Sequence, residues 1–267
     1  MFKKLSLSLA VALTLSACAE TAQQAQMELS GQQKGVIGGD KVSANSRISR
    51  STVGLYDENA KALCTGTLIA PNLVLTAAHC IDPTSDKMVV LFGQEFKNAD
   101  ASQLRRVVKK VQHKYYGEMK AEDMYDIAML RFEGTAPAGY APAPLLSDFS
   151  SIRKNTEVVV AGFGLNWAWG VKKGAGTLRT TTLKVKSPMN GSTEIMLDQS
   201  LRRGICSGDS GGPAYLDVNG QLYLLGVASR GDSLPIPLTP DCFILSVFTR
   251  VDAHADWINE TALELLK

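Results

Sequence analysis

The sequence predicts an all-β fold of the barrel or sandwich type that ends in one α-helix. The first observation is a series of short apolar runs separated by turn residues, which begins after residue 35. The second is the number and spacing of these runs, which are typical of barrels and sandwiches. The third is a change in apolar period near the C-terminus, where apolar residues recur at steps of three and four.

Nine segments carry the strand pattern. Each is a short apolar run bounded by polar or turn-forming residues, as expected for strands of a compact β domain. By residue number the segments are 52–56, 66–70, 72–78, 87–93, 105–112, 127–132, 157–164, 221–229 and 244–251. The Pro- and Ala-rich stretch 136–145 is predicted to connect two β halves.

The C-terminal segment is predicted to be a helix over residues 251–266. Its apolar positions form one helical face that would pack on the β body: Val251, Ala255, Ile258, Ala262 and Leu265.

The composition limits the classes of function. The chain has 267 residues, of which 45% are apolar, enough for one large all-β domain or two small ones. The 28 basic residues become equal in number to the 26 acidic ones if Lys3 and Lys4 are removed with a signal segment. With no like-charge run, we predict no binding of nucleic acid. No motif calls for a cofactor or a metal ion, and we predict neither.

The N-terminus predicts export. Two lysines precede the apolar stretch 5–15, which is too short for a membrane span and is followed by small residues. "LSAC", residues 15–18, resembles the lipobox of bacterial lipoproteins, which implies a signal peptide over 1–17 and a lipidated Cys18. Ordinary cleavage after Ala19 is the alternative, because "ACA" also fits a small-x-small site.

The cysteine count supports lipidation. Five cysteines are present, and an odd cysteine in an exported protein needs an explanation of its own. A lipidated Cys18 would leave four, enough for two disulfides in an oxidising compartment. The segment 18–35 is rich in Ala, Gln and Ser and has little to bury, so it is predicted to be a tether or pro-segment.

"CSGDSGGPAY", residues 206–215, is the most specific stretch of the chain. Ser210 lies among glycines that allow a tight turn, in which two N–H groups can converge and stabilise an oxyanion. The stretch also satisfies G-x-S-x-G, the nucleophile elbow of α/β-hydrolase esterases. However, an elbow leads directly into a helix, which Gly212 and Pro213 would begin badly, and those enzymes place their histidine after the serine.

A serine nucleophile needs a base and an acid. Of the three histidines, His79 follows a predicted strand and is the base candidate, whereas His113 is predicted to be a surface or loop residue and His254 a helix residue. Asp126 begins an apolar strand and would be partly buried, so it needs a partner. Asp123 is its rival. The order in the chain is then base, acid, nucleophile.

These motifs together resemble the chymotrypsin-like (trypsin-family) serine endopeptidases. "TAAHC", "DIAML" and "GDSGGP" are similar to the three catalytic motifs of that family, in order, and the resemblance extends over about 36–258. It implies two six-stranded Greek-key β-barrels packed together, over about 36–140 and 146–250, followed by the helix. The peptidase domain would thus span 36–267.

The resemblance also implies roles for single residues. Ser210 would be the nucleophile, His79 the general base and then acid, and Asp126 the residue that orients the imidazole. The N–H groups of Gly208 and Ser210 would form the oxyanion hole, and Ser229 would support the aspartate. The family pairing implies the disulfides Cys64–Cys80 and Cys206–Cys242. A homologue that keeps the fold as a noncatalytic binding module is the alternative.

The resemblance further implies a substrate pocket without charge. Its floor position is Gly204, where trypsin-like members carry an aspartate, and its other positions are Ile205, Ser229, Gly231 and Ser246. A neutral pocket does not compensate the burial of a cation, so we expect apolar side chains rather than Arg or Lys. Arg230 replaces the usual aromatic residue. Either Asp232 or Asp241, in the insertion 231–241, would overturn this expectation by turning inward.

"VIGG", residues 36–39, resembles the tetrapeptide at which the family is activated. The resemblance implies that an activating protease cuts before Val36 and that the new amino group pairs with Asp209. The sequence departs from the family because Gly35 separates Lys34 from the cut. The expected partners are therefore protein or peptide substrates, an activating protease and a membrane reached through Cys18. The expected location is the bacterial outer membrane or periplasm, or outside the cell after processing.

Overall fold

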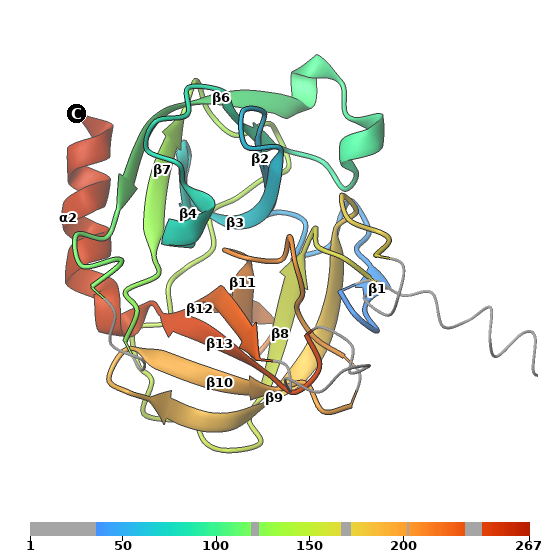
Figure 1. Ribbon diagram of the computed structural model, residues 1–267, viewed down its shortest axis with the longest axis vertical. Coiled ribbons are helices and arrows are strands. Elements are labelled where there is room, and N and C mark those ends of the chain that lie inside the picture. Colours follow the sequence, from blue (N-terminus) through green and yellow to red (C-terminus); the bar gives the residue numbers. More distant parts are fainter. Residues whose placement is uncertain (1–35, 119–122, 167–171, 202, 233–241) are drawn as a thin grey trace, which may run out of the picture.

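The computed structural model shows two β-barrels side by side and one C-terminal helix (Figure 1). It describes residues 36–118, 123–166, 172–201, 203–232 and 242–267. The predicted signal peptide, lipidated Cys18 and tether lie outside the described residues. The all-β class with two six-stranded barrels and a terminal helix, implied by the sequence, is confirmed.

The first barrel is a closed sheet of six antiparallel strands in the order β2-β3-β4-β7-β6-β5. Their bounds are β2 Thr52–Asp57, β3 Ala62–Ala70, β4 Leu73–Thr76, β5 Met88–Leu91, β6 Leu104–Gln112 and β7 Ala128–Phe132. Three short 3₁₀ turns interrupt it, namely η1 Ala78–Cys80, η2 Phe96–Asn98 and η3 Ala101–Gln103. Its interior is filled by fully buried aliphatic side chains, among them Leu55, Leu68, Leu75, Val90 and Met129. Closure leaves no unpaired strand edge.

The second barrel runs in the order β9-β10-β13-β12-β11-β8 and closes through the pairing of β8 with β9. Its strands are β8 Glu157–Gly162, β9 Arg179–Asn190, β10 Glu194–Asp198, β11 Pro213–Val218, β12 Gln221–Asp232 and β13 Leu245–Arg250. A two-residue strand, β1 Asp40–Lys41, adds to β9 from outside. The connector 136–145 links the barrels, because the Ala143 N–H donates to the Leu68 carbonyl in one and the Pro144 carbonyl accepts from the Leu224 N–H in the other.

The predicted helix is present but starts later than expected. A 3₁₀ turn, η4 Asp252–His254, precedes α2 Ala255–Leu266. Tight 3₁₀ turns are common where an α-helix begins, and an apolar period does not distinguish the two. Ile258 and Leu265 of the helix are buried, and Arg131 of β7 donates to the carbonyl of Leu265. The helix thus covers the first barrel, as Figure 1 shows.

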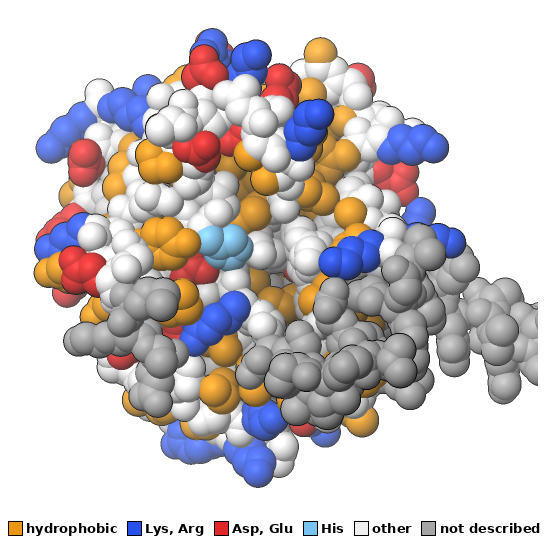
Figure 2. Space-filling view, in the orientation of Figure 1, with side chains coloured by type: hydrophobic (Ala, Val, Ile, Leu, Met, Phe, Trp, Pro, Cys, Tyr) orange, Lys and Arg blue, Asp and Glu red, His pale blue; other side chains and the backbone are white. Residues whose placement is uncertain are grey.

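Charges are mixed over the face seen in Figure 2, where basic and acidic side chains are interspersed. No helix among the described residues combines the length and apolar character needed to cross a bilayer.

Candidate active site

His79 and Asp126 meet at one edge of the first barrel. Thr76 at the end of β4 pairs with Ala128 at the start of β7, so the chain beyond β4 and the chain before β7 lie together. η1 then turns His79 toward Asp126, and the His79 Nδ1 to Asp126 Oδ2 distance is 2.8 Å. The His79 backbone N–H also donates to Asp126 Oδ1, at 3.0 Å. Because a carboxylate only accepts, Nδ1 carries the proton and Nε2 is left as a base.

The second barrel completes the surroundings of Asp126. Ser229 of β12 donates its hydroxyl to Asp126 Oδ2 at 2.6 Å, and Thr249 of β13 donates to the Asp126 carbonyl at 3.1 Å. Burial of Asp126 alone would raise its pKa, but the hydrogen bonds from His79 and Ser229 outweigh burial and hold the pKa below its ordinary value. Asp126 is thus an ionised acceptor fixed by both barrels.

Ser210 lies on the loop before β11, at the junction of the barrels. The Thr65 N–H of β3 donates to the Ser210 carbonyl at 2.8 Å, and the Gly211 N–H donates to Ala228 of β12 at 2.7 Å. The Ser210 carbonyl oxygen also lies 3.5 Å from the sulfur of Cys80, the residue after His79. These contacts hold Ser210 beside the segment that carries the imidazole.

Two glycines give this loop its path. Gly208 and Gly211 have positive φ angles of 95° and 78°. A Cβ on Gly211 would lie 2.0 Å from Thr76 Oγ1 and 2.4 Å from the Thr65 carbonyl oxygen, so no other residue fits. Among the described residues, no backbone carbonyl accepts from the N–H of Gly208 or Ser210.

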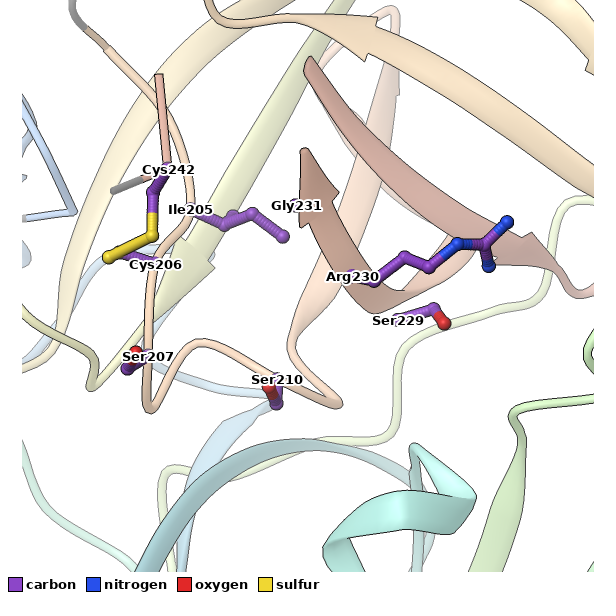
Figure 3. A pocket seen from close by; sticks show the side chains of 8 residues that line it. All are labelled: Ile205, Cys206, Ser207, Ser210, Ser229, Arg230, Gly231 and Cys242. Atoms are coloured by element: carbon purple, nitrogen blue, oxygen red, sulfur yellow. A yellow bond between two sulfur atoms is a disulfide. The ribbon is translucent and has the colours of Figure 1, made fainter. Parts of the chain in front are cut away.

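A pocket of about 240 Å³ opens beside Ser210. Figure 3 shows Ile205 and the Cys206–Cys242 disulfide on one side, and Ser229 and Arg230 on the other. The remaining lining residues are Ser207 and Gly231. Among the described lining residues Arg230 alone carries a charge.

The other two predicted pocket residues, Gly204 and Ser246, are not among the residues that line it. Gly204 and Ser246 are buried, and the Ser246 hydroxyl has no hydrogen-bond partner among the described residues. Of the two acids considered as alternatives, Asp241 and the side chain of Asp232 lie outside what the structure describes.

Gln199 supports two residues of the pocket wall, a role that the sequence did not indicate. It is 1% exposed, and its amide accepts from the Ile205 N–H at 2.8 Å and donates to the Cys242 carbonyl at 3.0 Å. It also fills the space where a Cβ of Gly204 would stand, 2.2 Å away. An amide surrounded by polar residues in a sequence gives no signal of such a role.

Asp209 is wholly buried beneath the Ser210 loop. Its carboxylate accepts from the Gly164 N–H at 2.7 Å and from the Cys206 N–H at 2.8 Å. Burial raises its pKa to about 7, because these two bonds and the more distant Arg179 only partly offset the loss of water. Gly162 and Gly164 leave the room it occupies, since a Cβ on either would meet its carboxylate.

Val36 is fully buried in the second barrel, in the core cluster that includes Ile205. The carbonyl of Ile37 accepts from the Gly204 N–H at 2.9 Å, which ties this segment to the pocket region. The segment 36–39 is thus part of the body of the protein.

The remaining acidic and histidine candidates have other partners. Asp123 accepts from the backbone and hydroxyls of Ser192 and Thr193 in the turn between β9 and β10. His113 lies in the loop after β6, as predicted, but it is not at the surface, because it is 7% exposed and stacks on Tyr125. His254 is buried beside it, and burial lowers the His254 pKa to about 4.

The structure contains both expected disulfides, Cys64–Cys80 and Cys206–Cys242. Cys64 and Cys80 bring their sulfurs close to the His79 ring, but oxidised cysteines do not bind a metal as thiolates. This cluster is therefore not a metal site.

Comparison with known proteins gives one consistent result. Residues 36–258 match the family described as Trypsin. The chain is 31% identical over 245 residues to chymotrypsin-like elastase family member 1 of Bos taurus, covering 84% of this chain and 88% of the relative. It is 31% identical over 248 residues to the Homo sapiens protein of that name, covering 84% and 91%. Transmembrane protease serine 9 of Rattus norvegicus is 29% identical over 224 residues, covering 79% and 20%.

Proposed function

Because this chain belongs to the trypsin family of serine proteases, we propose that it is a serine endopeptidase that uses Ser210, His79 and Asp126. The observation that carries the proposal is the hydrogen-bonded series from Ser229 through Asp126 to His79, beside the Ser210 pocket. Protein or peptide chains are the substrates. The chemistry is that of serine proteases in general.

Acylation is the first half of the reaction. His79 Nε2 takes the proton of the Ser210 hydroxyl as its oxygen attacks the substrate carbonyl carbon. The carbonyl oxygen becomes an oxyanion and accepts hydrogen bonds from the N–H groups of Gly208 and Ser210. The C–N bond then breaks, and the imidazolium donates its proton to the leaving amine. Asp126 stabilises the imidazolium and keeps Nδ1 protonated.

Deacylation repeats these steps with water. His79 takes a proton from water, whose oxygen attacks the acyl carbon. The second tetrahedral intermediate releases the carboxylic product, and the proton returns to Ser210 Oγ.

We expect the pocket to prefer an apolar side chain at P1, the residue whose carbonyl is attacked. Ile205 supplies an apolar wall, and Gly204 at the expected floor position offers no carboxylate. Matched substrates with Arg, Phe, Leu or Ala at P1 test this, and a strong preference for Arg would refute it.

The chain is made as a zymogen in this proposal. Cleavage before Val36 creates an α-ammonium that pairs with Asp209, the buried carboxylate under the oxyanion loop. The burial of Val36 and the raised pKa of Asp209 support it, because a cation would stabilise the ionised carboxylate. Gly35 requires either a protease that cuts after glycine or trimming after a cut at Lys34.

Export completes the proposal. The signal over 1–17 directs the chain out of the cytoplasm, and Cys18 carries the lipid. The activating cut then also separates the catalytic domain from its anchor. N-terminal sequencing of the active form, together with its mass, tests the cut and the lipid.

The two alternatives are disfavoured for different reasons. The hypothesis of an α/β-hydrolase conflicts with the all-β fold, in which Pro213 after the serine loop begins β11 rather than a helix. A noncatalytic homologue is tested directly by a fluorophosphonate probe. Labelling that disappears in Ser210→Ala supports the enzyme, and a processed chain that neither reacts nor cleaves peptides supports the binding module.

A further inference from the structure

Arg230 carries its charge to the rim of the substrate pocket. It follows Ser229, which bonds the catalytic-site aspartate, and it lines the same pocket as Ser210. Its side chain is 31% exposed. In Figure 3 it extends away from the Cys206–Cys242 disulfide and Ile205, so it lies outside the part of the pocket where a P1 side chain would enter.

A buried carboxylate holds the guanidinium in place. Glu194 of β10 is fully buried and accepts from Arg230 through both terminal nitrogens, each at 2.7 Å. Such paired bonds fix the plane of a guanidinium and reduce the entropy lost when it binds another group.

The two partners of this ion pair differ in exposure, because Glu194 is fully buried and Arg230 is partly exposed. Glu194 also accepts from Asn190 Nδ2 at 2.9 Å and from the Met124 N–H at 3.3 Å, so its negative charge is spread over several donors inside the protein. The positive partner is at the surface. A substrate therefore meets the cationic end of the pair, whereas the anionic end is beyond its reach.

We propose that Arg230 is a specificity-determining residue that binds the carboxylate of an acidic substrate side chain near the scissile bond, outside P1. This rests on the proposed peptidase function and narrows it to a substrate class. A guanidinium with a fixed plane binds carboxylates well, and it repels a lysine at the same substrate position.

The test compares peptides that differ by one side chain. Internally quenched peptides with a common P1 carry Asp, Asn or Lys at each of the three positions before it. Active enzyme is counted by fluorophosphonate titration, so kcat/KM refers to competent sites alone. Asn matches Asp in shape without its charge, and a ratio of the two within one variant cancels any general loss of activity.

At one position we expect kcat/KM for Asp to exceed that for Asn by about fivefold to tenfold, with Lys lowest. Raising the salt concentration reduces the ratio, because the site is partly exposed. Arg230→Gln combined with Glu194→Gln removes both charges without leaving a buried ion, and it brings the ratio to about one. Arg230→Lys keeps the charge and retains part of the preference.

Arg47→Gln is the matched control. Arg47 pairs with Asp217 and Gly220 at the turn that begins β12, whereas Arg230 lies near the end of that strand. The variant loses the same charge and should leave the ratio unchanged. Equal cleavage of Asp and Asn peptides by the wild type at all three positions overturns the inference, as does an unchanged ratio in the double variant. If no probe labels Ser210, the proposed function itself fails.

Discussion

Two buried aspartates beside the pocket differ in how their charge is compensated. Asp126 accepts from the His79 ring and backbone and from the Ser229 hydroxyl, and its pKa lies below the ordinary value. Asp209 is more deeply buried, accepts from two backbone N–H groups, and has a pKa of about 7. Burial opposes ionisation in both.

The charge of one aspartate is compensated within the protein, and the charge of the other is not. A neighbouring imidazole and a hydroxyl stabilise the ionised form of Asp126, so the base side is ready for proton transfer. On the Asp209 side, two backbone N–H groups and the charge of Arg179 do not outweigh burial, so the pKa of the carboxyl stays raised. We infer that the loop with the Gly208 and Ser210 N–H groups depends on a cation supplied later, at residue 36.

Ser210→Ala should have the strongest effect on activity, because it removes the proposed nucleophile. We expect kcat to fall by about 10⁶, as for serine proteases in general. Steady-state kinetics on a peptide substrate measures this, with circular dichroism to show that the fold is kept. A fall of less than about a hundredfold would contradict the role of Ser210.

Asp126→Asn removes only the carboxylate that accepts from the His79 ring. An amide can donate to Nδ1 and favour the wrong imidazole tautomer, so kcat should fall by about 10⁴. Asp123→Asn is the control, because Asp123 caps the β9–β10 turn and does not contact His79. If the two variants lose activity equally, Asp126 has no special part in the reaction.

Val36→Gly tests the proposed pairing of the new terminus with Asp209. It removes a fully buried side chain at the proposed new terminus, at a cost of about 2–3 kcal/mol, so activity should fall by roughly 30-fold to 160-fold. Val90→Gly is the control, because it removes the same fully buried side chain from the first barrel, outside the cluster that contains Val36. A fully active Val36→Gly enzyme would refute insertion of the terminus.

The stability of the uncleaved chain should depend on pH through Asp209, with a modest effect. The pKa of Asp209 in the folded, uncleaved chain is above that of an unfolded aspartate, so the folded state binds its proton more tightly. The contribution of Asp209 to the free energy of unfolding is thus fully present below about pH 4. It is lost as pH rises to about 7, by at most about 4 kcal/mol. Urea unfolding of uncleaved Ser210→Ala across this range measures the slope. Adding Asp209→Asn should flatten the dependence of the unfolding free energy on pH. An unchanged slope would mean that another group causes the dependence.

Much of the fold was predictable because apolar runs mark strands that are buried on the inner face. Strand β9 was not among the predicted segments, although alternate residues point inward. The buried positions near its start are Arg179 and Thr181, so the pattern there is polar on both faces. β10 and β11 are short and sit beside charged or glycine-rich stretches, which weakens their signal.

The site was predictable where its chemistry follows from short motifs. His79, Asp126 and Ser210 each stand in such a motif. The partners that hold them are set by three-dimensional packing, and no local pattern reports them. Glu194 meets Arg230 across 36 residues, and Gln199 braces the pocket wall from a polar stretch.

Pairing of the new N-terminus with Asp209 can be measured through the pKa of Asp209 before and after cleavage. Carboxyl ¹³C NMR of aspartate-labelled Ser210→Ala protein follows the titration in the uncleaved chain and in the chain cleaved before Val36. We predict a pKa of about 7 before cleavage and a value below the ordinary aspartate range afterwards, because the new ammonium stabilises the carboxylate. The same pKa in both forms would show that the new terminus does not pair with Asp209.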